Sequence, residues 1–491
     1  MLEQTDTSTP AQANGQTTGP NPAASTSAEW VNDIHSALNA TRVRRIEQPD
    51  TTSRVQTAVK TAHLERRAVA VAAGRGAMGG QQFASDGILF DMNSFNQVID
   101  FDPAAGWITV GAGIQWPELI DYLHQAQAGQ QWQWSIKQKQ TGGDRLSIGG
   151  TLAANAHGRG LDFTPIVGDV ESFTLVDAQA RVHHCSRDEN AQLFRLAIGG
   201  YGLFGVIATV TLRLVPRRRL RRVVEIVEAS ELPARFQGRI DDGFLYGDFQ
   251  FCTDPDADGF LSRGVFSCYH PVSSAAAASG PQKTLSEQEW MELLRLAHVD
   301  KARAYELYSA YYLSTSGQLY WSDSHQLSTY IDDYHHRLGE RIGDQQHGSE
   351  MISEIYVPRE VLPDFLAKVA DDFRRHEVDL IYGTIRLIRR DDETFLAWAK
   401  QDYACVIFNL HTQHSPAALH KTRDDFRRLI DRGLEYGGSY FLTYHRWATA
   451  EQVEACYPQF REFLRVKREL DPEERFQSDW YRHYRAMFEL G

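Results

Sequence analysis

The chain has 491 residues, of which 42% are hydrophobic and 23% are charged, a balance typical of a globular protein with a sizeable core. Its formal net charge of −13 argues against non-specific binding to nucleic acid or anionic membranes, and no apolar run approaches the ~20 residues that span a bilayer. Five scattered cysteines without a CxxC pair favour reduced thiols and a cytoplasmic location.

The N-terminal segment differs from the rest of the chain. Residues 1–29 hold almost no large apolar side chains, so we expect a disordered tail. The tail has no basic stretch followed by an apolar one, so it does not resemble a secretory signal.

Helix and strand patterns alternate over residues 30–216, the expected first domain. The predicted helices are 53–66, 116–126 and the first part of 188–216. The predicted strands are 68–73, 87–92, 107–113, a pair within 167–185, and the last part of 188–216. The basic run RRRLRR (217–222) is interpreted as a solvated connector that leaves this domain.

Residues 217–450 form a second domain in this interpretation, and residues 451–491 follow it as a C-terminal segment. The second domain mixes strands and helices without a fixed-period repeat. Its predicted strands are 243–253, 262–272, the start of 354–376, 379–390 and 403–412, and its predicted helices are 286–312, the rest of 354–376, and 420–438.

The stretch VAAGRGAMGG (71–80) contains an unusual density of glycine, with four in the seven residues 74–80. Glycine loses much backbone entropy on folding, so such a run needs a reason. It is not a dinucleotide-binding GxGxxG, because no helical pattern follows it, and it lacks a Walker lysine. Two interpretations remain: a structural turn, or a nest of backbone N–H groups that binds a phosphate.

Two further glycine-rich stretches favour the phosphate interpretation. TGGDRLSIGGTLAANAHGRG (141–160) and GGYGLFGVI (199–207) lie on the same α/β frame. Three small-residue segments together predict a pocket for a large, flat, phosphorylated ligand.

These segments resemble a known family. VAAGRGAMGG, WITVGAGIQWPELIDYL, SIGGTLAANAHGRG and GGYGLFGVIATVTLRLVP are similar, in order and spacing, to the FAD-binding domain of the vanillyl-alcohol-oxidase superfamily, also called PCMH-type. RVKRELDPEERFQSDW (465–480) is similar to the tail of that family. The resemblance implies an α+β protein with a two-subdomain FAD-binding domain and an α+β substrate or cap domain. The middle region is only loosely similar to alditol and sugar oxidases and to decaprenylphosphoryl-ribose oxidase.

The resemblance implies FAD as the cofactor and assigns the loops to its parts. The first loop would hold the pyrophosphate, the second would line the isoalloxazine and ribityl chain, and the third would meet the adenine. His157 would lie beside the flavin, and the alternative is a hydrogen-bonded buried histidine. The implied cofactor-binding residues are Gly74, Arg75, Gly76, Ala77, Met78, Gly79, Gly80, Gly142, Gly143, Ser147, Gly149, Gly150, Ala153, Ala154, Ala156, His157, Gly160, Val206 and Ile207.

One departure from the family concerns attachment of the cofactor. Many relatives carry a histidine at the position of Ala77 and bond FAD through it, and residues 130–160 contain no cysteine for a second bond. We therefore expect non-covalent FAD, with a linkage from the cap side, for example through His445, as the alternative.

Catalysis requires a proton acceptor and positive charge near the reacting atoms. Tyr444 and His445, in YFLTYHRW, and Arg386, in YGTIRLIRR, are the candidate catalytic residues, because the matching segments of relatives reach the flavin or the substrate. Weaker candidates are His411, Asn409, Cys405 and Glu354. The aromatic residues Tyr311, Tyr312, Tyr320 and Trp321 could line a pocket, but core packing is favoured. The run DDYHHR (332–337) lacks a ligand pattern, so we expect no metal site.

The sequence therefore predicts an FAD-dependent oxidase or dehydrogenase. It would remove a hydride from an alcohol-type carbon of a small molecule such as a sugar, polyol, lactone or natural product, and pass electrons to oxygen or another acceptor. The alternatives are a flavin-dependent C=C reductase or desaturase, and a flavin-binding protein without turnover.

Overall fold

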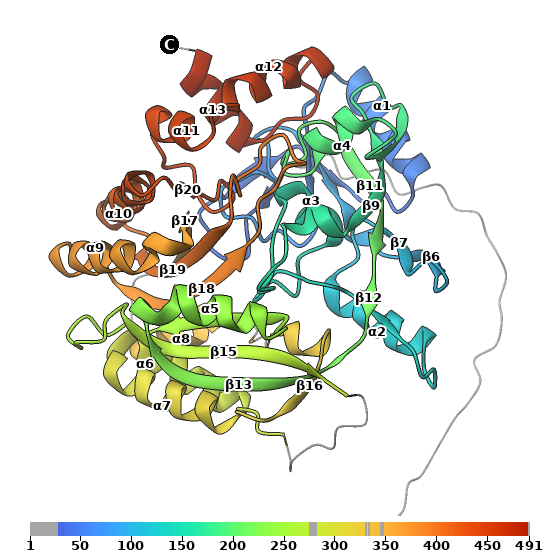
Figure 1. Ribbon diagram of the computed structural model, residues 1–491. Coiled ribbons are helices and arrows are strands. Elements are labelled where there is room, and N and C mark those ends of the chain that lie inside the picture. Colours follow the sequence, from blue (N-terminus) through green and yellow to red (C-terminus); the bar gives the residue numbers. More distant parts are fainter. Residues whose placement is uncertain (1–27, 274–281, 329–330, 332–333, 344–347, 490–491) are drawn as a thin grey trace, which may run out of the picture.

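Helices and sheets are mixed throughout the computed structural model, which describes residues 28–273, 282–328, 331, 334–343 and 348–489, so the chain is an α+β protein (Figure 1). Most of the expected N-terminal tail lies outside the described residues. The end of that segment already pairs with later strands, because β1 begins at Glu29.

The first part of the chain builds a small parallel sheet with strand order β3-β5-β4. Helix α1 crosses between β3 and β4, and the Thr51 side chain caps it by accepting from the Arg54 amide. The elements are β1 (Glu29–Val31), β2 (Thr41–Val43), β3 (Arg45–Glu47), α1 (Thr52–Leu64), β4 (Val69–Ala72) and β5 (Ile88–Asp91). The glycine-rich loop 74–80 leaves the carboxyl end of β4.

A five-stranded antiparallel sheet with order β10-β9-β11-β7-β6 follows. This part of the chain contains β6 (Val98–Asp102), β7 (Trp107–Gly111), α2 (Trp116–Ala126), β8 (Trp134–Ser135), α3 (Ile148–Ala154), β9 (Val170–Val176), β10 (Val182–Ser186), α4 (Ala191–Ala197), β11 (Val206–Arg213) and β12 (Val215–Pro216). Strands β8 and β12 pair with each other as a separate two-stranded sheet. The glycine-rich stretch 141–160 contains a helix, α3, although its glycines suggest a loop. Ser147 caps the short helix α3, and Asn155 ends it in a left-handed conformation with φ 48°.

The remaining strands form one eight-stranded sheet with order β16-β13-β15-β14-β18-β19-β17-β20. They are β13 (Arg219–Glu228), β14 (Tyr246–Phe251), β15 (Arg263–Val272), β16 (Leu319–Trp321), β17 (Gly348–Pro358), β18 (Leu380–Ile388), β19 (Tyr403–Gln413) and β20 (Ser439–Tyr440). The interpretation of 217–222 as a solvated connector is wrong for its second half. This half opens β13, which pairs with β15 over ten residues, and Arg222 is buried.

Helices cover this sheet. They are α5 (Leu232–Asp241), α6 (Glu287–Val299), α7 (Lys301–Ser314), α8 (Tyr334–Ile342), α9 (Leu362–Arg375) and α10 (Pro416–Glu435). The single helix predicted over 286–312 is two helices, because Asp300 ends α6 and its side chain caps α7. Successive residues of β18 point to opposite faces. Ile385 and Leu387 join the core with Phe365 of α9, whereas Thr384 and Arg386 line a cavity.

The C-terminal segment carries α11 (Ala450–Cys456), α12 (Phe460–Leu470) and α13 (Asp479–Glu489), which lie together at one end of the molecule (Figure 1). Between α12 and α13 the chain pairs with β4. The Val69 amide donates to the Arg475 carbonyl at 2.7 Å, and the Gln477 amide donates to the Val69 carbonyl at 2.9 Å. The last residues therefore brace the strand that leads into the glycine-rich loop.

Candidate functional site

A cavity of about 1140 Å³ lies where the glycine-rich loops meet the eight-stranded sheet. Its lining comes from loop 74–77, the 140–154 stretch, one face of β17, β18 and β19, and the α7 and β16 region. Typical small-molecule pockets measure roughly 300–1,000 Å³. The cavity therefore has room for a dinucleotide-sized ligand with a second, smaller molecule beside it.

The glycine-rich loop presents bare backbone to this cavity. Gly74 is required by close approach, because a Cβ atom there would lie 2.1 Å from the Arg145 carbonyl oxygen. Arg75 adopts a left-handed φ of 52° and pairs with Asp91 at 3.0 Å. In the part of the chain that the structure describes, the amides of Arg75, Gly76 and Ala77 donate to no protein acceptor. Such neighbouring free N–H groups fit a bound pyrophosphate.

The structure brings twelve of the nineteen implied cofactor-binding residues to the cavity wall. The lining residues are Gly74, Arg75, Gly76, Ala77, Gly142, Gly143, Ser147, Gly149, Gly150, Ala153, Ala154 and Ile207. The residues behind the wall are Met78, Gly79, Gly80, Ala156, His157, Gly160 and Val206. Met78, Gly79 and Gly80 lie behind the wall because the first loop leaves the cavity after Ala77. The Gly79 amide, for example, donates to the Thr443 carbonyl at 3.0 Å.

Tyr444 stands at the cavity wall on the segment that follows β20. Its side chain is 6% exposed, and its hydroxyl accepts a hydrogen bond from Gln140 Nε2 at 3.1 Å. Burial raises the pKa of the Tyr444 phenol well above its usual range, and the neighbouring Glu354 carboxylate raises it further. The phenol therefore stays protonated at neutral pH and can act only by passing its proton on.

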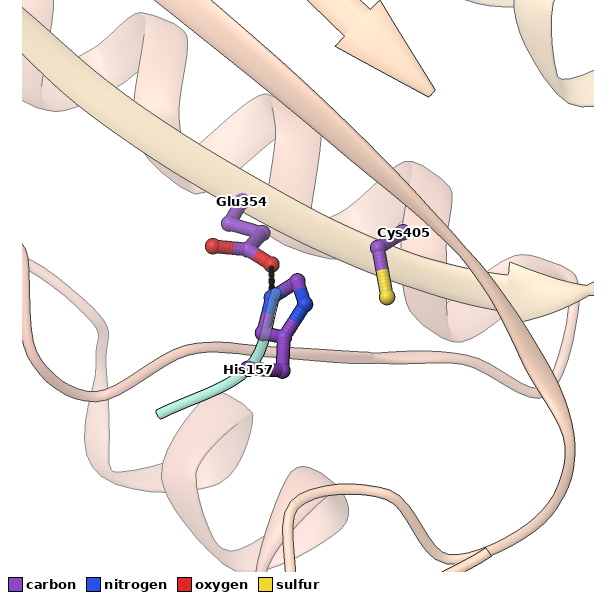
Figure 2. A group of neighbouring side chains, drawn as sticks. All are labelled: His157, Glu354 and Cys405. Carbon is purple, nitrogen blue, oxygen red and sulfur yellow. Dashed lines mark hydrogen bonds and ion pairs between the residues drawn. The ribbon is translucent and has the colours of Figure 1, made fainter. Parts of the chain in front are cut away.

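Behind Tyr444, the buried residues His157, Glu354 and Cys405 converge (Figure 2). The two nitrogens of His157 both face oxygen. Nδ1 lies 3.0 Å from the Gly158 carbonyl, and Nε2 forms a close contact with Glu354 Oε1. A carbonyl can only accept, so Nδ1 carries a hydrogen. The contact between Nε2 and Oε1 then holds one shared proton.

Cys405 completes this group without adding reactivity. Burial raises the pKa of its thiol well above the usual value, with a further contribution from Glu354. The thiolate that a metal or an electrophile would require is therefore disfavoured. A second group of possible ligands among the described residues, His298, Glu350 and His411, lies outside the cavity lining.

Arg386 enters the cavity from β18 with no protein partner for its charge. It is 6% exposed, and among the described residues it donates no hydrogen bond and has no carboxylate within 4.0 Å. The cross-strand register sets it opposite Cys405, and Glu354 opposite Ile407. Arg386, Tyr444 and Glu354 thus belong to one corner of the site, where Arg386 lowers and Glu354 raises the pKa of Tyr444.

The structure corrects the placement of His445. This side chain is 3% exposed, stacks on Phe426 with ring centroids 4.6 Å apart, and does not line the cavity. Burial lowers the pKa of its imidazole to about 3. Tyr444 and His445 therefore have different surroundings, the cavity for Tyr444 and the Phe426 ring for His445.

Of the other candidate residues, some line the cavity and some do not. Asn409 lines the cavity, whereas His411 and Glu354 do not. Tyr311, Tyr312, Tyr320 and Trp321 all line it, so the preference for core packing is wrong. The run 332–337, considered above as a possible metal site, begins outside the described residues, at 332–333.

Sequence reasoning missed several polar residues of the cavity. Gln140 lines the wall and holds the Tyr444 hydroxyl. The preceding residue, Lys139, is buried outside the lining and pairs with the lining residue Asp144 at 2.5 Å. Arg159 and Arg222 also line the wall. The KQKQ run before the 141–160 stretch was a signal for Lys139 and Gln140, whereas nothing local distinguishes Arg222 from its basic neighbours.

No helix in the described ranges is both long enough and apolar enough to cross a membrane. The five cysteines are free and buried.

Comparisons with known proteins agree with this geometry. The family model "FAD binding domain" matches residues 43–186, and the model "D-arabinono-1,4-lactone oxidase" matches residues 344–484. The L-gulono-1,4-lactone dehydrogenase of Mycobacterium tuberculosis is 25% identical over 401 residues, which cover 81% of this chain and 86% of that protein. The mitochondrial L-galactono-1,4-lactone dehydrogenase 2 of Oryza sativa is 31% identical over 205 residues, 41% of this chain and 34% of its own.

A third relative, the putative D-arabinono-1,4-lactone oxidase of Neurospora crassa, is 28% identical over 169 residues, 34% of this chain and 29% of its own. The two family models fall on the two halves of the cavity, one on the glycine-rich loops and the other on the strands that carry Glu354 and Arg386. The chain belongs to the FAD-dependent oxidoreductases with a PCMH-type FAD-binding domain, and it is an enzyme that uses FAD.

Proposed function

We propose that this enzyme oxidises a hydroxyl-bearing carbon of a sugar lactone or a closely related sugar derivative, and that oxygen or another acceptor then takes the electrons. The relatives named as lactone dehydrogenases and oxidases support the substrate class. The observation that carries the proposal is the buried chain that runs from Tyr444, at the cavity wall, to Glu354 and His157 behind it.

Loop 74–77 and the lining residues of the 142–154 stretch would hold FAD, which supplies hydride acceptance when it is bound. The free amides of Arg75, Gly76 and Ala77 suit its pyrophosphate. Residues 30–216 would form the FAD-binding domain in two subdomains around the parallel and antiparallel sheets, residues 217–450 the cap, and 451–491 the returning segment. The free buried cysteines support a reducing, cytoplasmic compartment.

The side chains at the wall can take the proton that an alcohol must lose. In this proposal the substrate hydroxyl donates its proton to Tyr444, as Tyr444 gives its own to Glu354. The hydrogen bond to the Gly158 carbonyl fixes the His157 ring. Nε2 of His157 shares a proton with Glu354, which adjusts the charge of the His157–Glu354 pair. Arg386 stabilises negative charge that develops in the cavity, because no described carboxylate neutralises it.

Anaerobic mixing with a panel of sugar lactones, aldoses, polyols and aromatic alcohols tests the proposal. We expect the flavin absorbance to bleach with at least one sugar derivative, because the wall beside Tyr444 is polar and hydrogen-bonding. Bleaching by aromatic alcohols alone would contradict the substrate class. The same samples, readmitted to air, show whether oxygen is the acceptor.

The FAD of this enzyme is expected to dissociate on acid precipitation. Ala77 lines the cavity where many relatives carry the bonding histidine, and no described cysteine lines it. The yellow colour should therefore appear in the supernatant. Colour that stays with the pellet would show a covalent bond, and the residue to test next is then His35, whose Nε2 lies 3.5 Å from a Cβ built on Gly76, rather than the stacked His445.

A further inference from the structure

The charge of the cavity is opposite to that of the chain. The whole sequence carries 64 acidic and 51 basic residues, yet the described residues that line the cavity include six arginines and lysines and a single carboxylate, that of Asp144. The basic lining residues are Arg75, Arg159, Arg219, Arg222, Lys283 and Arg386. Arg75 belongs to the loop that would hold the cofactor pyrophosphate. The other positive charges of the lining are therefore available to another ligand. A cleft lined by charges of one sign concentrates ligands of the opposite charge.

Arg159 is, beside Arg386, a second buried lining cation with an unsatisfied donor. It is 8% exposed, and its Nε has no hydrogen-bond partner among the described residues. One Nη donates to the His325 carbonyl, and the other lies 3.8 Å from Asp248, too far for a direct hydrogen bond. A buried guanidinium with an unused N–H group is costly unless a ligand satisfies it.

A second cation reinforces Arg159. The Arg222 side chain donates to the Tyr269 hydroxyl and to Thr315 Oγ1 at 3.0 Å, and its guanidinium packs on the Tyr312 and Tyr320 rings at 5.0 Å. These contacts hold Arg222 in place, with its positive charge close enough to repel that of Arg159. A bound anion beside Arg159 and Arg222 would offset the repulsion between the two guanidinium groups.

We propose that the substrate carries an oxyanion, a carboxylate or a phosphate, which Arg159 binds at the cap-side end of the cavity. The proposal rests on the function proposed above and narrows it to acidic sugar derivatives. Arg159 would donate its Nε–H to one oxygen of the substrate anion, and the positive charge of Arg222 would attract the anion without a direct hydrogen bond. The rings of Tyr312, Tyr320 and Trp321 would face the carbon skeleton, and the oxidised carbon would lie at the Tyr444 end.

Matched pairs of sugars that differ by one anionic group test this inference. D-gluconate against D-glucitol examines a carboxylate, and D-glucose 6-phosphate against D-glucose examines a phosphate. Anaerobic flavin reduction by the wild-type holoenzyme gives the dissociation constant of each. The anionic member of at least one pair is expected to bind about 10-fold or more tightly, the scale of a charge-assisted hydrogen bond.

In Arg159→Gln the anionic member should lose about 10- to 100-fold in affinity while its neutral partner changes less than about threefold. Arg159→Lys should keep part of the preference. Arg359→Gln is the matched control, because Arg359 also has an unpartnered Nε but lies outside the cavity, and it should leave every constant unchanged. FAD content and the melting temperature report on folding.

Several results overturn the inference. The inference is wrong if the wild-type enzyme binds the neutral sugar of each pair more tightly than the anionic one. It is also wrong if Arg159→Gln weakens the binding of both sugars of a pair equally. If no sugar of either kind reduces the flavin, the proposed function fails instead. In that case, titrations with inorganic phosphate and with acetate, monitored through the flavin absorbance, test the oxyanion site directly. Equal affinities in the wild type and in Arg159→Gln would reject the site.

Discussion

Replacing Tyr444 by phenylalanine is expected to slow anaerobic flavin reduction about 100-fold, the lower range for the loss of a positioned acid or base. The phenol is buried at the cavity wall, held by Gln140, and linked to Glu354. Phenylalanine keeps the ring and its packing on Phe441 but removes the cavity-wall hydroxyl that would pass a proton to Glu354. Stopped-flow absorbance at saturating substrate measures the effect, and FAD content should not change.

Controls separate proton transfer from packing. Tyr440→Phe removes a buried hydroxyl from the same segment, outside the cavity, and should leave the reduction rate within a few-fold of wild type. His445→Ala should do the same, since the imidazole is stacked on Phe426. Glu354→Gln should slow reduction as Tyr444→Phe does, and the double variant should be far less than additive because the two residues act together. An unchanged rate in Tyr444→Phe would reject the proton chain.

Replacing Arg386 by methionine is expected to slow flavin reduction about 100- to 1,000-fold, the scale for the removal of one preorganised electrostatic donor. The guanidinium is buried, faces the cavity from β18, and has no protein carboxylate within 4.0 Å among the described residues. Its charge is therefore available to stabilise negative charge during the reaction. Methionine fills similar volume without that charge.

Arg389→Met is the matched control for Arg386→Met. Arg389 follows in the same stretch but is exposed and pairs with Asp162 at 2.8 Å, so its loss should not alter the rate. Arg386→Met should slow neutral and acidic sugars alike, whereas Arg159→Gln should weaken the binding of acidic ones only. Equal reduction rates in Arg386→Met and wild type, at equal FAD content, would contradict the role in charge stabilisation.

Local sequence signals predicted the first domain well. Val55, Ala58, Val59 and Ala62 recur at helical spacing, and all four are buried on α1 as that pattern requires. Helix α2 has the predicted bounds 116–126. Such elements follow from periodicity and capping, which neighbouring residues determine. The break between α6 and α7 was missed because it depends on Asp300 as a cap rather than on a glycine or proline.

Several residues of the site could not be placed from periodicity. Glu354, on β17, meets His157, which lies 197 positions earlier in the chain, and this contact depends on how two domains pack. Arg222 reads as one of five arginines in a basic run, and only the pairing of β13 with β15 and β16 turns it inward. The aromatic residues 311, 312, 320 and 321 pack at a cavity wall rather than in a core for the same reason.

The sequence by itself determined that this protein uses FAD and that it carries glycine-rich loops, because close backbone approach at positions such as Gly74 requires particular residues at fixed local spacing. It also determined the order of most helices and strands. Only the tertiary structure decided that Tyr444 rather than His445 faces the cavity, and that Arg159, Arg222 and Arg386 converge on it. The physical reason is that charge and proton transfer depend on distances between side chains remote in sequence, which sheet register and domain packing set and local patterns do not encode.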